Sequence, residues 1–400
     1  MIAATRYVRR CRECWHTADF DLPTLTKRVI YLDQFAISDM MKSLNPTTKG
    51  HLAASRDSRW RDLFRRLDRL SKLQLIVCPE SKFHHDESTL SSFSESLKRL
   101  YELLSSGVTF RNSSLMECGQ LRRHTLRWLA GRPQEPIDMS VARVVHGDIH
   151  GWTERLLFTW DARLPEQEIS KLRAVRSRIH TELVKLFETW AREKRSFEEV
   201  FAEEVADFGR VLVAACRQSS VKAMRVLTGV DPLTDLDVFL PSPAGLRLHA
   251  IQAALREGGV PTSDHVRRML EYLSSESVQY VPFLRIRAML YAAVARKAAA
   301  GQKHPPTTGL VTDVEMVSLL LPYCDAMLVD GEIAGYLKEE PLVSSIGFPC
   351  KVFSPRTIPQ FMTYLDKIET AATPEHLKKV EEVYGADWPQ PFETLYTSER

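Results

Sequence analysis

The sequence lacks an uninterrupted apolar run of about 20 residues, the length that spans a bilayer, and its first residues lack the apolar stretch of a secretory signal. Its seven cysteines are odd in number and irregularly spaced, at positions 11, 14, 78, 118, 216, 324 and 350. Such a set argues against a disulfide framework and favours a reducing compartment. We therefore expect a cytoplasmic protein with no membrane partner.

The chain also has little net charge, because 54 Lys and Arg residues nearly balance 51 Asp and Glu residues. Overall charge therefore does not identify a nucleic-acid-binding protein, although local basic patches remain open. One run, Arg173, Arg176 and Arg178, could contact phosphate. A solvated helix face balanced by Glu182 and Glu188 is the favoured interpretation of that run.

No fixed-period repeat is present, which argues against a regular solenoid. What is present is an ordinary globular composition over 400 residues, 44% hydrophobic and 26% charged. That length exceeds one typical domain. We expect two domains, or one domain with a large insertion.

Short apolar runs typical of buried strands occur only towards the two ends of the chain, at 28–33, 73–79, 326–330 and 351–353. Helical periodicity separates them, and residues 1–27 look irregular. Strands that alternate with helices favour a parallel sheet with helices on both faces.

Between these end segments, apolar residues recur three and four positions apart, which predicts a helical block. The sheet pieces at either end are too small to be stable alone. We therefore predict one α/β domain built from 28–94 and 306–368, interrupted by an all-α insertion at 95–305 and followed by a tail at 369–400.

Four acidic residues occupy positions where a parallel α/β sheet binds ligands. Asp33 and Asp330 each end a predicted strand, Glu87 lies in the helix after the second strand, and Asp313 begins the helix before the Asp330 strand. Because ligands bind at the carboxyl ends of parallel strands, all four carboxylates are expected at one rim.

Clustered carboxylates raise one another's pKa, and hard divalent cations relieve that repulsion. Mg²⁺ prefers oxygen ligands. One or two such ions activate water and stabilise the leaving oxygen of a phosphodiester. The acidic rim therefore predicts a metal-dependent site for phosphodiester hydrolysis.

The chain resembles PIN-like nucleases in three segments: Ile30-Tyr-Leu-Asp33-Gln, Ser81-Lys-Phe-His84-His-Asp-Glu87, and a segment from Asp313 through Leu321-Pro-Tyr-Cys-Asp325 to Asp330. It is most similar to bacterial members that have a long inner spacer and a Pro-Tyr-Cys-Asp segment. The resemblance covers 28–105 and 308–368 and says little about the helical middle. It implies a three-layer α/β/α PIN-like fold, Mg²⁺ or Mn²⁺, and hydrolysis of RNA.

The resemblance also assigns residues. Asp33, Glu87, Asp313 and Asp330 are the expected catalytic acids and metal ligands, with Asp325 as an added metal ligand. RNA is the expected nucleic-acid partner, and the helical block is expected to select substrate, bind a regulatory protein or self-associate. A role as a toxin or phage-defence effector is implied by the resemblance alone.

Simpler interpretations exist for several of these residues. For Asp33 the simpler interpretation is an acid that ends a strand and begins a turn, as Asp often does. Ser81 is a natural helix N-cap, with His84 three positions later. Thr312 and Glu315 have the spacing of a capping box, so we assign Glu315 to capping rather than to metal binding.

Two further motifs leave alternatives open. Cys11-x-x-Cys14 with His16 could be half a zinc site, but no second Cys-x-x-Cys pair exists. The segment His146-Gly-Asp148-Ile-His150-Gly resembles loops of phosphotransferases and phosphatases, yet lacks their companion motifs. A turn between helices is the favoured interpretation of that segment.

Two rivals to a nuclease therefore remain: a catalytically silent PIN-like scaffold that binds RNA or protein, and a phosphotransferase or phosphatase centred on Asp148.

Overall fold

A four-stranded parallel sheet joins the two ends of the chain. The computed structural model describes residues 2–3, 5–11, 13–89, 91–153, 166–230, 232 and 242–396. The strands are β4 (Arg28–Leu32), β5 (Ile76–Val77), β8 (Ala326–Leu328) and β9 (Lys351–Phe353), in the order β5-β4-β8-β9. Every pairing is parallel, with Ile30 opposite Ala326. The prediction of one sheet built from both ends is confirmed.

Helices pack on both faces of this sheet because alternate residues of β4 point to opposite sides. Val29 and Tyr31 enter one hydrophobic core. Ile30 and Leu32 enter the other. The first core includes α12 (Pro282–Ala299), α13 (Leu310–Leu320) and α14 (Gly331–Leu337), and the second includes α1 (Gln34–Leu44), α3 (Ser58–Lys72), α5 (Ser94–Ser105) and α16 (Ile358–Thr370).

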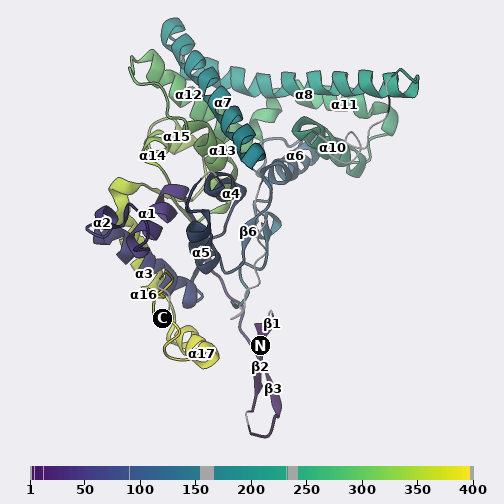
Figure 1. Cartoon of the computed structure of the whole chain (residues 1–400). Coiled ribbons are helices and arrows are strands. Elements are labelled where there is room, and N and C mark those ends of the chain that lie inside the picture. The colour runs from purple at the N-terminus through teal and green to yellow at the C-terminus, as the bar shows by residue number, and fades with distance from the viewer. Residues whose placement is uncertain are drawn as a thin grey trace.

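The middle of the chain is helical in the part that the structure describes, as predicted. Its helices are α6 (Ser113–Leu129), α7 (Glu166–Glu193), α8 (Phe197–Leu227), α10 (Pro243–Glu257), α11 (His265–Leu273) and α12. Ser196 and Glu199 form a capping box that starts α8. The one addition is a two-stranded pair, β6 (Thr109–Phe110) with β7 (Val145–His146). Figure 1 shows α8 as a long rod crossed by α7 at one end of the molecule.

Shorter helices complete the chain: α2 (His51–Ala54), α4 (Lys82–Ser88), α15 (Leu342–Ser345) and α17 (Pro374–Tyr384). No helix among the described residues is both long enough and apolar enough to cross a membrane. The side chains of Arg173 and Arg176 lie outside the described residues, so the solvated helix face favoured for that run stays a prediction.

The expectation of an irregular N-terminus was wrong. Strands β1 (Ile2–Ala3), β2 (Arg6–Arg10) and β3 (Thr17–Asp21) form an antiparallel sheet. Most residues of β2 and β3 are exposed on both faces, so they lack the apolar alternation that predicts a strand. The hairpin of β2 and β3 extends away from the helices (Figure 1).

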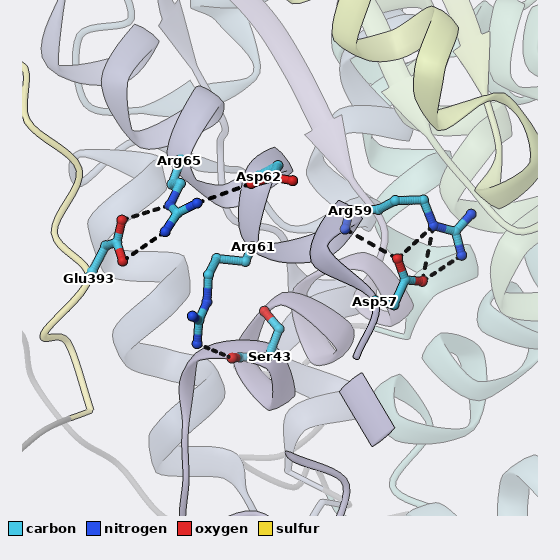
Figure 2. Close-up of polar contacts among 7 residues, drawn as sticks. All are labelled: Ser43, Asp57, Arg59, Arg61, Asp62, Arg65 and Glu393. Carbon is cyan, nitrogen blue, oxygen red and sulfur yellow. Dashed lines mark hydrogen bonds and ion pairs between the residues drawn. The ribbon is translucent and has the colours of Figure 1, made fainter. Parts of the chain in front are cut away.

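The C-terminal residues, predicted as a tail, pack back on the sheet domain. Val380 and Val383 of α17 share a small core with Leu22 and Leu25. Arg65 of α3 donates to Glu393 at 2.6 Å, and other arginines of that helix bind Asp57 and the Ser43 carbonyl (Figure 2). Exposed ion pairs contribute little, so the apolar packing is the main attachment.

Candidate metal centre

Asp33 and Asp330 follow neighbouring parallel strands at the same edge of the sheet. Asp33 comes directly after β4, Asp330 comes shortly after β8, and the two strands pair side by side. From β4 the chain proceeds outwards to β5, and from β8 it proceeds in the other direction to β9. Ligands of open α/β sheets bind in the crevice at such a reversal of strand order.

Both acids are also helix N-caps, whereas the simpler interpretation of Asp33 was a strand end that begins a turn. Oδ1 of Asp33 accepts from the Gln34 amide at 2.6 Å and begins α1. Oδ1 of Asp330 accepts from the Glu332 amide at 2.7 Å and begins α14. Helix N-termini stabilise carboxylates. Capping and a role in a site are therefore compatible at these two positions.

The four predicted acids interact electrostatically. Burial raises the pKa of Asp33 to about 7, with repulsion from Glu87 and Asp330 adding to the rise. Burial raises the pKa of Asp313 to about 8, and repulsion from Asp33, Glu87 and Asp330 adds to it. The structure thus brings all four together, although they come from four separate segments of the chain. Near neutral pH, ionisation of Asp33 and Asp313 is therefore opposed, and a bound cation would favour it.

Glu87 is positioned by the start of α4. Ser81 caps this helix and His84 bonds back to the Ser81 amide, so the predicted capping role of both residues is confirmed. Nδ1 of His84 accepts from that amide at 3.2 Å, and Nε2, which must then carry the proton, donates to the Leu32 carbonyl at 2.7 Å. Burial lowers the pKa of His84 to about 3. A neutral histidine therefore ties α4 to the residue that precedes Asp33.

Two neighbouring side chains were missed at the sequence level. Glu332 also raises the pKa of Asp313, so it is a fifth carboxylate of the cluster. Oε1 of Gln34 is buried without a hydrogen-bond partner among the described residues. Both follow a predicted acid within two positions, which is the signal that could have identified them. Nε2 of Gln34 donates to Ser88, the residue after Glu87, at 3.3 Å, and an unpaired buried oxygen on the same side chain fits a place that receives a cation or an ordered water.

The donor set fits a hard divalent cation, since its side-chain groups are carboxylate and amide oxygens. Among the described residues, however, no three His, Cys, Asp or Glu side chains form a group arranged to hold a metal ion. One oxygen each of Asp33 and Asp330 already accepts a helix amide. Metal binding by these two residues would use their other oxygens or a side-chain rotation.

Asp325 lies elsewhere, and its expected place in the site is corrected. It precedes β8, whereas Asp330 follows that strand, so Asp325 belongs to the opposite edge of the sheet. Its Oδ2 accepts from the Val29 amide at 2.8 Å, and its Oδ1 pairs with Arg28 at 2.8 Å. These bonds link the beginnings of β4 and β8, which is a structural role.

The predicted capping box at Thr312 and Glu315 was wrong. Helix α13 begins at Leu310 after Gly309, with no side-chain cap, so Thr312 already lies inside it. Burial raises the pKa of Glu315, and the charge of Arg287 partly offsets this rise.

Asp148 forms a turn, as favoured from the sequence. Its Oδ1 accepts from the His150 amide at 3.0 Å, and Gly147 adopts a positive φ of 87°. The charge of Asp148 acts on Lys27, whose pKa burial lowers to about 8. None of these residues belongs to the acidic cluster.

Comparison with known proteins adds no assignment: no family model matches the chain, and neither curated proteins nor solved structures give a significant match.

Proposed function

We propose that this chain is a metal-dependent endonuclease of the PIN-like class that hydrolyses phosphodiester bonds. The observation that carries the proposal is a set of carboxylates at the reversal of strand order, where burial and the charges of Glu87 and Asp330 raise the pKa of both Asp33 and Asp313. Perturbed carboxylates in a crevice are typical of functional sites. RNA as the substrate, in preference to DNA, rests on the resemblance to PIN-like nucleases.

In this proposal the four acids hold one or two Mg²⁺ or Mn²⁺ ions through carboxylate oxygens. A bound ion would supply Lewis acidity at the phosphodiester. The chain's own contribution is to bury and orient its carboxylates: the first turns of α1 and α14 fix Asp33 and Asp330. His84 fixes α4, which carries Glu87, against the end of β4. Gln34 bonds to Ser88, next to Glu87 in sequence, and its amide oxygen has no partner among the described residues.

A titration with Mn²⁺, followed by the melting temperature, tests whether the acids bind metal. A ligand that binds only the folded state stabilises it, by about 2.7 kcal/mol at one hundred times its Kd. The wild-type chain should gain stability on addition of Mn²⁺ or Mg²⁺, and Asp330→Asn should gain much less. Asp325→Asn is the matched control, since Asp325 lies at the other edge of the sheet and should leave the gain unchanged.

A catalytically silent PIN-like scaffold is the second candidate, and one observation favours it. The described side chains do not form a group arranged for metal binding. A silent scaffold predicts that metal raises the melting temperature of neither wild type nor Asp330→Asn. Equal gains in wild type and Asp330→Asn would also contradict the proposed nuclease site.

A further inference from the structure

The tip of the N-terminal hairpin carries two exposed cysteines. Strands β2 and β3 pair as far as Arg10 opposite Thr17. The Cys11 amide then donates to the His16 carbonyl at 2.8 Å and closes the loop. Cys11 and Cys14 are both exposed and free. Because the hairpin extends away from the helices, its tip is accessible to another molecule (Figure 1).

The loop is folded around the sulfur of Cys11. Backbone amides of Cys14 and Glu13 donate to this sulfur. Trp15 adopts a left-handed φ of 62°, which turns the chain directly after Cys14. Arg10 lies 4.0 Å from the Trp15 ring centroid, so the turn is packed on the strand. A Cys-x-x-Cys spacing with outer hydrogen bonds to sulfur is the local structure of a zinc half-site.

Cys11 and Cys14 have no further ligand beside them in the described part of the chain. There, no three His, Cys, Asp or Glu side chains form a group that could hold a metal ion. Cys-x-x-Cys occurs once in the sequence, and Cys78, Cys216 and Cys324 are buried. Structural zinc sites take four ligands in a tetrahedron, so we look for the remaining two in a second molecule.

We propose that two copies of the chain share one Zn²⁺ between their hairpin tips, with Cys11 and Cys14 of each copy as the four ligands. A two-fold axis through the ion makes the contact self-complementary, which is the commonest symmetry of a homodimer. Thiolates suit Zn²⁺, and each cysteine releases its proton to solvent on binding. The site differs in chemistry from the oxygen-lined acidic cluster, and it does not depend on the proposed nuclease activity.

The test uses the full chain, purified under reducing conditions, loaded with Zn²⁺ and freed of excess metal. Elemental analysis should find about one Zn²⁺ for every two chains. Sedimentation equilibrium should show a dimer with Zn²⁺ and a monomer after a chelator removes it. Cys14→Ser should lose both the zinc and the dimer, while its melting temperature stays close to that of wild type because the tip is exposed.

Three control variants separate this site from others. Cys118→Ser, a cysteine outside the tip, should keep the zinc and the dimer. Asp33→Asn should keep them as well, which distinguishes the tip from the acidic cluster. His16→Ala should also keep them.

The proposal is overturned by a wild-type chain that binds no Zn²⁺. A wild-type chain that binds one Zn²⁺ per monomer, and loses it in His16→Ala, would also overturn the proposal. So would a dimer that persists in Cys14→Ser. A mass two hydrogens lighter, which marks a Cys11–Cys14 disulfide in place of the metal, would also contradict it.

Discussion

The backbone amide of Asp33 donates to the carbonyl oxygen of Leu328 at 2.9 Å. This bond extends the pairing of β4 with β8 by one residue, to the point where both strands have ended. It therefore fixes Asp33 close to the turn that carries Asp330. The helical middle of the chain lies between two segments that meet at this bond, so the acidic cluster forms only when the two ends of the sheet have assembled.

Neutralising Asp313 should stabilise the metal-free protein in a pH-dependent way. The pKa of Asp313 is raised from 3.8 to about 8 in the folded chain, so the folded state holds a proton that the unfolded state releases. Its contribution to stability therefore falls as the pH rises from about 4 to about 8. The stability of Asp313→Asn relative to wild type should therefore increase from pH 4 to pH 8, by up to about 1.4 kcal/mol for each pH unit. Urea unfolding with a chelator present measures the free energy of unfolding of both proteins. A difference between them that does not change with pH would contradict the prediction.

His84→Ala should destabilise the chain without abolishing folding. The variant loses the bond to Leu32 and the stacking on Tyr31 and Tyr101, at ring distances of 4.9 and 4.5 Å. Loss of these interactions costs roughly 2–4 kcal/mol at pH 7.5. Because folding lowers the pKa of His84 from 6.5 to about 3, wild type loses this stability as the pH falls below about 6.5. The difference in unfolding free energy should narrow at pH 5, and a widening difference would show that His84 is charged in the fold.

Asp325→Ala should weaken the sheet and leave the metal response intact. The Val29 amide loses its side-chain acceptor, which costs about 1–2 kcal/mol. Arg28→Ala should cost less than about 1 kcal/mol, because the Arg28 side chain is 58% exposed. Melting scans with and without Mn²⁺ compare the two variants. If Asp325→Ala lost the metal-dependent gain while its metal-free stability was unchanged, Asp325 would be a ligand after all.

Glu332→Gln should shift the pH profile of the proposed activity. Glu332 helps to raise the pKa of Asp313, so its neutralisation lowers that pKa and allows ionisation at lower pH. The acidic limb of the metal-dependent cleavage rate should therefore move to lower pH. Rates measured from pH 5.5 to pH 9 test this. Loss of cleavage at every pH would indicate instead that Glu332 is itself a required ligand.

The sequence predicted the sheet, Asp33 and Asp330 for a local reason: an apolar run that ends in an acid identifies the carboxyl end of a strand. Glu87 and Asp313 were placed through the helices that adjoin these strands. Asp325 was assigned by the resemblance alone, and its place was wrong because the acid precedes its strand and bonds to Arg28 and Val29, which are distant in sequence. The N-terminal hairpin was missed because both of its strands are largely exposed and carry no apolar alternation.

The start of α13 was misplaced for another reason. Thr312 and Glu315 have the spacing of a cap, yet the helix already begins at Leu310, whose side chain is fully buried. Packing of that apolar turn outweighs a local capping preference. Such non-local packing is not visible in a window of a few residues.

Cleavage of a mixed RNA and of single-stranded DNA, with Mg²⁺ or Mn²⁺ and with a chelator, tests the central claim most directly. Three proteins are compared: wild type, Asp33→Asn and Asp148→Asn. Asn keeps the shape and the capping oxygen of Asp33 while it removes one charge and one good ligand. The account predicts metal-dependent cleavage of RNA by wild type and by Asp148→Asn, and none by a folded Asp33→Asn. Cleavage by Asp33→Asn at the wild-type rate, or cleavage lost only in Asp148→Asn, would contradict it.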